Sequence, residues 1–415
     1  MKTTRTMMAL GALLTGCGGS DDHSPDAPPP TPDAPTFAGG AAIPLTSPDG
    51  SFYTASLVIN SVGYALDIDT GSSSTGIAGT ACTGCPVHPL YAPSPTAVDT
   101  HMTAQTQYAD GSGWSGEIIT DKAGLANATP DVNLSLVAIN QQMGGFFADN
   151  SYQGIFGLGP KELLETGTTS YFDAATAAGL APIMGFEMCD TSGTMWVGGF
   201  DASAAASTPV FTPLLPITGQ SNPFYAVNVT DMGLGGTSLG FGSTTFQNPI
   251  VDTGTTIFYI PTAVDTALLA AINNSAGFKA LFPGKTLDDT NCAQGATTVT
   301  AAMVDAMLPP MSMSFAGMAG GAPVTVSVPA MSSYLYGGNP GEVCFAFADG
   351  GSGNQYFGVM GDTIMRAFVT VIDLQNQRVG FAPDAGCHGH QALAQVPVHG
   401  GGRPREHGHP RRHAR

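Results

Sequence analysis

The chain has 415 residues, enough for two or three domains, and its formal net charge is −18. Only 11% of the residues are charged and 43% are hydrophobic, while glycine (55) and proline (31) are frequent, which is typical of a folded chain of short strands and turns. Most of the 13 basic residues lie in the first five and last 13 positions, so the chain lacks the basic surface that nucleic acid needs.

The N-terminus predicts an export signal. Lys2 and Arg5 precede an apolar run that is too short to span a bilayer. The run ends in Leu-Thr-Gly-Cys at positions 14–17, which resembles a bacterial lipobox and implies lipidation of the Cys17 thiol. We therefore expect residues 1–17 to be a lipoprotein signal. The protein would then be exported and anchored to the bacterial outer membrane or cell surface; a plain secretory signal is the alternative.

Short β-rich runs follow a tether. Residues 18–40 are rich in proline and aspartate and predict an extended linker. Beyond it, Gln105–Tyr108 and Glu117–Thr120 predict a hairpin around Asp110 and Gly111. Alternation also predicts a strand at Phe224–Val229.

Helices are expected to be few, and the chain divides into two halves and a tail. The best helix pattern covers residues 262–272, and a shorter one covers residues 171–178. A stretch of small residues near position 204 places the boundary between an N-terminal lobe, 41–204, and a C-terminal lobe, 205–387. Residues 388–415 hold six of the nine histidines and five arginines, and we expect disorder there, with binding of metal or polyanions as the alternative.

One short pattern occurs once in each half. Apolar residues lead into Asp-Thr-Gly-Ser at 69–72 and into Asp-Thr-Gly-Thr at 252–255. One such segment alone would be ordinary turn chemistry. Two copies indicate a duplicated unit that supplies one carboxylate from each half.

Both copies resemble the active-site loops of pepsin-like aspartic proteases, over roughly residues 41–387. Tyr108–Gly113 is similar to the flap of that family, Gly154–Gly159 to the segment that closes the first loop, and Val359–Asp362 to the end of the second lobe. The resemblance implies a mainly β, bilobal fold, a pepsin-like double β-barrel with the active-site cleft between its lobes. It also implies an aspartic endopeptidase that acts on a peptide or protein, without metal or cofactor, and a monomer is expected.

The chemistry of such a site needs two acids that share one proton. Two nearby carboxyls cannot both ionise easily, so one can act as a base on a bridging water while the other protonates the substrate. By resemblance, Asp69 and Asp252 form this pair. Glycines allow the tight turns that bring backbone N–H groups to the carboxylates, and hydroxyls bond across the interface or to the outer carboxylate oxygens. The supporting residues are expected to be Thr70, Gly71, Ser72, Thr253, Gly254 and Thr255.

The flap is expected to cover the substrate. By resemblance, Tyr108 closes over a bound peptide and excludes water, while the backbones of Ala109 and Asp110 pair with it. Many family members have a tryptophan seven residues after the first catalytic aspartate, but this chain has Gly76 there. Trp114 is a candidate to fill that gap.

Asp67 is a second departure from the family pattern. It lies two residues before Asp69, on the same side of a strand. It either perturbs the acid pair or is a solvated edge residue, and we favour the second interpretation.

The chain has seven cysteines, and six remain once Cys17 is set aside, which suits an oxidising compartment. Sequence alone leaves their connectivity open. The resemblance favours the pairs Cys82–Cys85, Cys189–Cys387 and Cys292–Cys344. A zinc site at Cys82, Cys85 and His88 is the alternative for the first pair, although no second ligand pair follows it.

Two rival functions remain. The segment Asp-Ile-Asp-Thr at 67–70 also matches haloacid-dehalogenase-like phosphatases, with Asp67 as nucleophile and Mg²⁺ as cofactor, but the chain lacks their alternation of strand and helix. The stronger rival is a catalytically silent pepsin-like protein that binds peptide or carbohydrate, because fold alone does not fix activity. Such proteins usually lose one aspartate or its turn, and both are present here, so we favour the protease.

Overall fold

The computed structural model describes residues 40–48, 50–125, 130–148, 151–218, 222–337, 339–351 and 358–386. The expected lipoprotein signal with Cys17, nearly all of the tether, and the His/Arg-rich tail lie outside the described residues. Among the helices of the described residues, none combines the length and the apolar character needed to cross a membrane.

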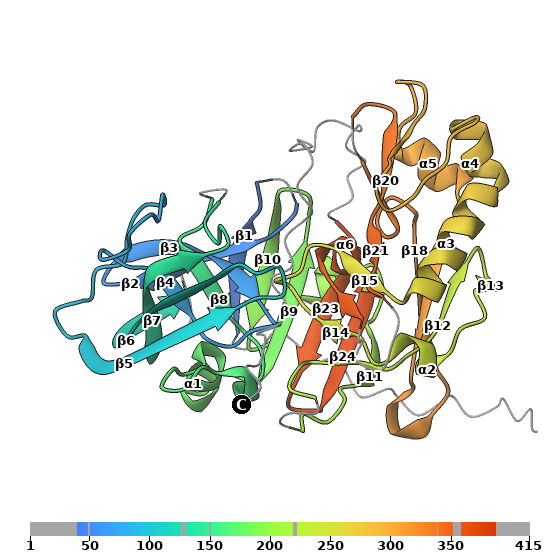
Figure 1. Ribbon diagram of the computed structural model, residues 1–415. Helices are drawn as coiled ribbons and strands as arrows, with labels where there is room; N and C mark the ends of the chain where they lie inside the picture. The colour runs from blue at the N-terminus through green and yellow to red at the C-terminus, as the bar shows by residue number, and fades with distance from the viewer. Residues whose placement is uncertain are drawn as a thin grey trace, which may run out of the picture. The chain divides into compact units, whose positions relative to one another are not determined.

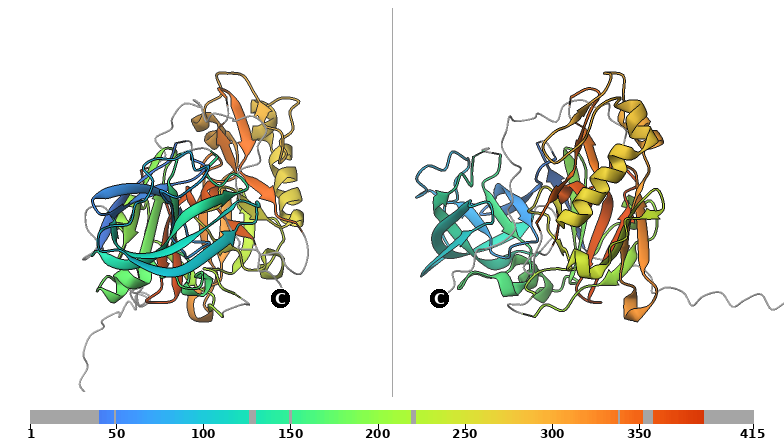
Figure 2. Two further views of the ribbon diagram at one scale, coloured as in Figure 1. Left: turned by 60° about the vertical axis from the view of Figure 1, so that its left-hand side comes forward. Right: turned by 45° about the vertical axis from the view of Figure 1, so that its right-hand side comes forward.

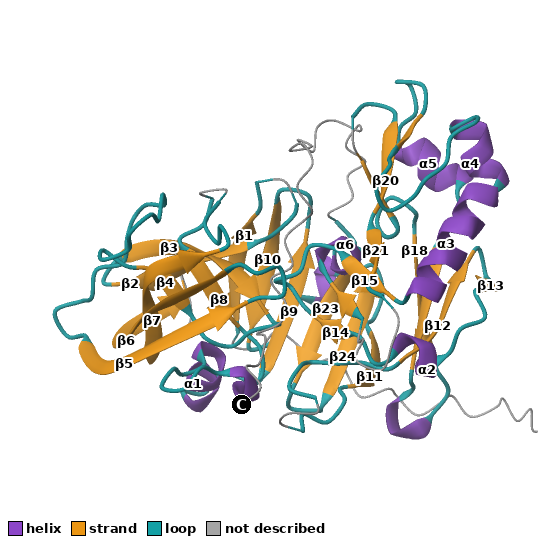
Figure 3. Ribbon diagram, viewed as in Figure 1, coloured by secondary structure: helices purple, strands orange, loops and turns teal. Residues whose placement is uncertain are grey.

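The described part of the chain is mainly β, as expected, and its helices are few and, apart from α3, short (Figure 3). Its largest sheet has 13 strands. In sheet order these are β11 (Val210–Pro213), β24 (Arg378–Pro383), β23 (Phe368–Asp373), β9 (Ile183–Met188), β10 (Ser192–Val197), β1 (Ala41–Thr46), β2 (Thr54–Ile59), β3 (Val62–Asp69), β8 (Gly154–Gly157), β4 (Gly76–Ala78), β7 (Val132–Met143), β6 (Gly113–Leu125) and β5 (Val98–Gln107).

Smaller sheets and six helices complete the described residues. One sheet holds β13 (Thr237–Ser238), β12 (Val229–Leu234), β17 (Met311–Phe315) and β18 (Val324–Val328). A second sheet holds β14 (Ile250–Val251), β22 (Val359–Met360), β15 (Phe258–Ile260) and β21 (Phe347–Asp349). A third sheet holds β16 (Ala293–Gln294), β20 (Glu342–Phe345) and β19 (Leu335–Gly337). The helices are α1 (Tyr171–Ala177), α2 (Ser243–Phe246), α3 (Thr262–Asn274), α4 (Ala276–Leu281), α5 (Ala301–Met307) and α6 (Asp362–Met365), with short 3₁₀ turns at Lys161–Leu163, Ala202–Ala204 and Met318–Gly320.

The two halves repeat one strand arrangement. In the first half, β3 is parallel to β8, β8 is antiparallel to β4, and β4 is parallel to β7. In the second half, β14, β22, β15 and β21 follow the same order with the same directions. The duplication seen in the loop motif is therefore also a duplication of topology.

The large sheet connects the two halves. The strands coloured blue to cyan and the elements coloured yellow to orange gather on opposite sides in Figures 1 and 2. Between them β9 pairs antiparallel with β23, through partners such as Phe186 and Thr370. The sheet contains strands from both sides of residue 204. The division into two lobes at that residue therefore stays a prediction.

Local patterns predicted several elements well. The hairpin expected around Asp110 is β5 and β6, with Gln107 paired to Gly113. Helix α3 was expected from its apolar spacing, and it buries Val264, Leu268 and Ile272 on one face.

The strand expected at Phe224–Val229 is wrong in its bounds, because β12 begins only at Val229. The preceding residues run extended beside β14 instead, where Val227 N donates to Pro249 O at 3.0 Å and Val251 N donates to Tyr225 O at 2.8 Å. Their side chains are buried in two different apolar clusters, so the alternating pattern has a packing origin.

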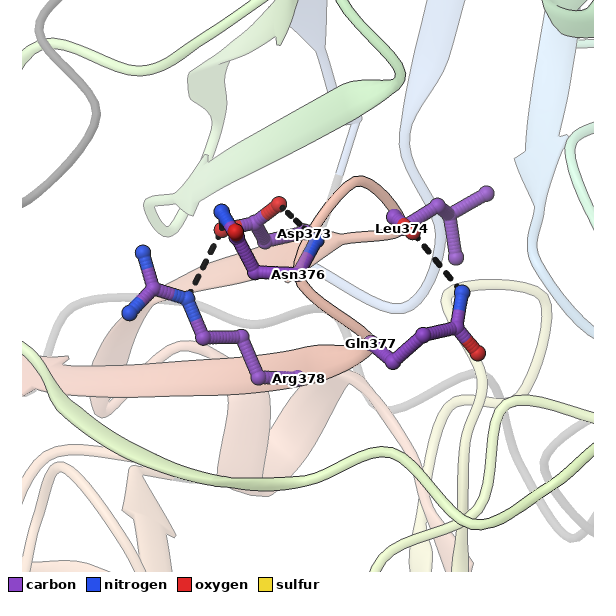
Figure 4. A network of polar contacts seen from close by, with 5 residues as sticks. All are labelled: Asp373, Leu374, Asn376, Gln377 and Arg378. Atoms are coloured by element: carbon purple, nitrogen blue, oxygen red, sulfur yellow. Dashed lines mark hydrogen bonds and ion pairs between the residues drawn. The ribbon is translucent and has the colours of Figure 1, made fainter. Parts of the chain in front are cut away.

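A buried ion pair fixes the turn between β23 and β24 (Figure 4). Asp373 is fully buried and accepts from Arg378 Nε at 2.7 Å and from Asn376 Nδ2 at 2.8 Å. The Arg378 guanidinium also lies 3.8 Å from the centre of the Phe211 ring. Both charges are thus paired and hydrogen-bonded inside the fold.

The structure contains two of the disulfides that the resemblance implies, Cys82–Cys85 and Cys292–Cys344. The zinc alternative for the first pair is wrong, because the two sulfurs are bonded to each other and neither is a free thiolate. The third expected pair joins Cys189 to Cys387, which lies outside the described residues.

Candidate active site

Equivalent strand ends position the two aspartates. Asp69 is the last residue of β3, and its carbonyl accepts from Leu158 N at 2.7 Å just after β8. Asp252 follows β14, and its N–H donates to Met360 O at 3.0 Å at the end of β22. Each acid is therefore fixed by a buried parallel strand pair before the chain turns away.

Each carboxylate is held by its own turn. Asp69 Oδ1 accepts from Gly71 N at 2.7 Å and Ser72 N at 3.1 Å, and Oδ2 accepts from Ser72 Oγ at 2.5 Å. Asp252 Oδ1 accepts from Gly254 N at 2.9 Å, and Oδ2 accepts from Thr255 Oγ1 at 2.9 Å. These hydrogen bonds favour a charged carboxylate on either side.

The two turns also hold each other. Thr70 N donates to Thr253 Oγ1 at 3.1 Å, and Thr253 N donates to Thr70 Oγ1 at 3.0 Å. The Thr70 hydroxyl in turn donates to Val251 O at 2.8 Å, and the Thr253 hydroxyl donates to Ile68 O at 2.9 Å. Four buried hydrogen bonds thus tie the loops together with near two-fold symmetry.

Each glycine of the motif lies against the opposite acid. A Cβ on Gly71 would lie 2.5 Å from Asp252 Oδ2, and a Cβ on Gly254 would overlap Asp69 Oδ1. No other amino acid fits without moving a carboxylate, because both sites are closed by the partner loop.

The carboxyls of Asp69 and Asp252 interact electrostatically with one another, and both side chains are fully buried. Burial first, and then the negative charge of Asp252, raise the pKa of Asp69 well above its ordinary value. Two neighbouring buried carboxyl groups cannot both ionise easily. The site can therefore hold one acid and one base side by side.

Tyr108 lies over this pair at the tip of the β5–β6 hairpin. It is fully buried, its hydroxyl hydrogen-bonds Ser72, and burial followed by the charge of Asp69 raises its pKa. Its N–H donates to Ser112 O at 2.8 Å, and Ser112 N donates to Asp110 Oδ1 at 2.7 Å, so the Asp110 carboxylate stabilises the tip. Ala109 is half-buried beside it.

Trp114 packs beside Gly76, together with Ile139. Its Nε1 donates to Tyr108 Oη at 3.0 Å, and its Cε2 lies 3.5 Å from where a Cβ on Gly76 would stand. The candidate role expected from the sequence therefore has a structural basis: the indole comes from β6 instead of from β4. It reaches the Tyr108 hydroxyl from there.

The interpretation of Asp67 as a solvated edge residue is wrong. Asp67 is only 1% exposed, because β3 lies inside the sheet between β2 and β8. Sequence reasoning also gave no role to Asp362, which is fully buried and interacts electrostatically with Asp67, Asp252 and Asp69. An aspartate inside an otherwise apolar motif, Val-Met-Gly-Asp, was the available signal.

Comparison with known proteins agrees with this geometry. The profile of the family described as Eukaryotic aspartyl protease matches residues 53–384. An aspartic protease of Phaffia rhodozyma is 26% identical over 353 residues, covering 83% of this chain and 79% of that protein. A beta-secretase of Strongylocentrotus purpuratus is 27% identical over 345 residues, covering 76% and 63%, and gastricsin of Macaca fuscata fuscata is 26% identical over 336 residues, covering 78% and 80%.

Proposed function

The chain belongs to the eukaryotic aspartyl protease family, and from this premise we propose that Asp69 and Asp252 are its catalytic acids. The protein is an aspartic-type endopeptidase, a hydrolase of peptide bonds. The observation that carries the assignment is the meeting of two fully buried acids, each held by an equivalent turn from one half of the chain and each lying against the glycine of the opposite turn.

In the proposed mechanism, a water binds between the two carboxyls. The ionised carboxylate takes a proton from this water as it attacks the peptide carbonyl, and the protonated partner donates to the carbonyl oxygen. The carboxyl that took a proton from the water then donates it to the leaving nitrogen as the peptide bond breaks. Ser72 and Thr255 hold the outer oxygens, so the inner oxygens stay directed at the substrate.

Substrate entry requires the flap to lift, because Asp69, Asp252 and Tyr108 are all fully buried in this conformation. We propose that Tyr108 closes again over the bound peptide and excludes water, and that the backbones of Ala109 and Asp110 pair with it. The interlobe hydrogen bonds of Thr70 and Thr253 stay intact during this motion, since they lie beneath the acids.

The test compares Asp69→Asn and Asp252→Asn with the unaltered protein. We expect each variant to lose at least about 10²-fold in kcat/KM for acid proteolysis of a peptide library, because one proton-transfer group is gone. A statine-type inhibitor should block the unaltered protein, and Glu117→Gln, on the exposed face of β6, is the matched carboxyl-to-amide control.

The opposite result would favour the catalytically silent binder. In that case the unaltered protein binds peptide or carbohydrate without turnover at any pH from 2 to 7, and binding survives Asp252→Asn. The presence of both acids and both complete turns supports the enzyme instead.

We also propose that Cys17 carries a lipid anchor that holds the enzyme, as a monomer, at the bacterial outer membrane or cell surface. The Leu-Thr-Gly-Cys sequence at 14–17 supports the anchor, and the presence of both acids in one chain supports the monomer. Metabolic labelling with a radioactive fatty acid should mark the protein, and Cys17→Ser should release it in unlabelled form. Labelling that survives this substitution would refute the anchor.

A further inference from the structure

The turn that follows β7 lies directly against the tip of the β5–β6 hairpin, the proposed flap. A Cβ on Gly144 would overlap Gly111 O at the tip, so the two backbones are in close contact. Two residues later, the Phe146 ring stacks on the Tyr108 ring, with centroids 5.9 Å apart and planes inclined by 13°. Residues 144–148, which we call the support turn, therefore contact the flap tip through both backbone and side chain.

The peptide group between Phe146 and Phe147 is held on both sides. Its carbonyl accepts from Tyr152 Oη at 2.5 Å, and its N–H donates to Gln142 Oε1 at 2.9 Å. These two directional hydrogen bonds fix the plane of the peptide group, and that plane sets the direction in which the Phe146 ring leaves the backbone. Without the Gln142 contact, the peptide could rotate and the ring could move off Tyr108.

The same Gln142 side chain reaches a second loop. Its Nε2 donates to Gly84 O at 2.5 Å, and in the β6–β7 register Gln142 stands opposite Trp114, whose indole donates to Tyr108. One amide thus joins the support turn to the loop of Gly84.

The Cys82–Cys85 disulfide closes that second loop. Thr83 N donates to Asn140 O at 3.2 Å, so the loop is also attached to β7 itself. The two cysteines pack against the buried cluster that contains the flap tyrosine and the phenylalanines of the support turn. Because a disulfide fixes the separation of its two cysteines, it limits where the Gly84 carbonyl can lie and gives Gln142 a fixed partner.

We propose that Gln142 is a positioning residue for peptide hydrolysis: it holds the Phe146–Phe147 peptide so that the Phe146 ring supports Tyr108 in the closed flap. The disulfide loop anchors Gln142 for this role. Because Tyr108 covers the peptide before and during the reaction, a closed flap that is less populated weakens the binding of substrate and transition state alike. The inference rests on the proposed function and on the proposed role of Tyr108.

Steady-state peptide cleavage at pH 3 tests this with Gln142→Met, which keeps the length of the side chain but has no amide. We expect KM to rise by about 3- to 10-fold with kcat nearly unchanged, because both hydrogen bonds of the amide are lost. Gln142→Glu should keep the KM of the unaltered protein, since a glutamic acid with its usual pKa of about 4.3 is neutral at pH 3 and can both donate and accept. Gln141→Met, at the exposed neighbouring position, is the matched control.

The double variant Cys82→Ser with Cys85→Ser tests the anchor. It should also raise KM, and combining it with Gln142→Met should add little, because both changes break the same connection. Fully additive effects would overturn the role of the loop. An unchanged KM in Gln142→Met, or a lower kcat at unchanged KM, would overturn the proposal, because poorer folding reduces the active fraction and leaves KM as it is.

Fluorescence separates this proposal from the proposed function, because it needs no activity. Trp196→Phe leaves Trp114 as the one tryptophan of the chain, and Trp114 is only 1% exposed. In this background, Gln142→Met and the cysteine double variant should each raise acrylamide quenching of Trp114 by about 2-fold, because the flap opens more often. Equal quenching in all variants overturns the proposal, whereas increased quenching without proteolysis in any protein refutes the enzyme alone.

Discussion

A single tryptophan holds Tyr108, the proposed flap tyrosine, from an unusual position. Trp114 in β6 donates to Tyr108 Oη, and it fills the space beside Gly76 in β4. The Trp114 indole packs where Gly76 has no side chain, so the roles of these two residues depend on each other. The sequence indicated both Gly76 and Trp114, but only the structure shows that β4 and β6 bring these two residues together.

We expect Trp114→Phe to lower kcat/KM by roughly 2- to 10-fold, because one buried hydrogen bond of about 0.5–1.5 kcal/mol is lost when the flap closes. Peptide cleavage at acidic pH measures the effect. Trp196→Phe is the matched control, since the other tryptophan lies in β10 in a separate apolar cluster. Equal losses in both variants would point to general destabilisation instead of flap closure.

The pKa of Asp121 is lowered on folding, whereas that of Asp69 is raised. Its burial alone would raise its pKa, but hydrogen bonds from the side chain and backbone of Ser94, the backbone of Lys122 and the Tyr91 hydroxyl outweigh this and lower it below 3.8. A lowered folded pKa stabilises the fold above the unfolded value, and the gain is lost as pH falls through the folded value.

Asp121→Asn should therefore lower the free energy of unfolding by about 1–3 kcal/mol at pH 6. The difference from the unaltered protein should shrink at a second, strongly acidic pH below the lowered folded pKa of Asp121, where its carboxyl is neutral like the amide. Urea unfolding at the two pH values measures this in a catalytically silent background. A difference that stays constant with pH would mean that the charge of Asp121 contributes nothing.

At the scale of elements, the β23–β24 hairpin depends on one buried ion pair. Asp373 has no exposed surface and accepts from both Arg378 and Asn376. The pair itself need not stabilise the fold more than apolar residues would, but removing one partner leaves a buried charge unpaired.

We expect Arg378→Met to destabilise the protein by about 3–5 kcal/mol, because the buried Asp373 carboxyl then loses its ion-pair partner. The midpoint of urea unfolding measures the loss. In the double variant Asp373→Leu with Arg378→Met the loss should be smaller, since both charges are gone. A double variant as unstable as the single one would assign the effect to packing on Phe211.

Elements with a strong local signal could be predicted from the sequence, and those shaped by distant partners could not. The turn residues Asp110 and Gly111 identify the β5–β6 hairpin, and the apolar spacing of α3 identifies that helix. The segment before β12 alternates because its side chains enter two different clusters, so its pattern predicts a strand that starts too early. Likewise, Asp67 is buried only because β2 and β8 flank β3.

At the scale of the whole molecule, a chain of net charge −18 buries several acids. Burial, with neighbouring acids, raises the pKa of Asp69, Asp362 and Asp265, the last to about 7. The folded state keeps these protons while the unfolded chain releases them. Stability therefore falls as pH rises from the unfolded value to the folded one and then levels off.

We expect the Tm of the Asp252→Asn variant, which avoids self-digestion, to fall between pH 4.5 and 7.5. Adding Asp265→Asn should flatten this decline, because the pKa of Asp265 changes from 3.8 to about 7 on folding. Adding Glu117→Gln should leave the decline unchanged. A Tm that rises over this range would contradict the dominance of the buried acids.

The tie between the two proposed catalytic loops should limit what the enzyme can cut. Because Thr70 and Thr253 lock the halves together beneath the acids, access depends on the β5–β6 hairpin swinging aside. A hairpin of this kind admits a single extended strand far more readily than a compact domain. Native proteins should accordingly be nicked first in their loosest linkers and termini, and heat-unfolded ones should be degraded throughout.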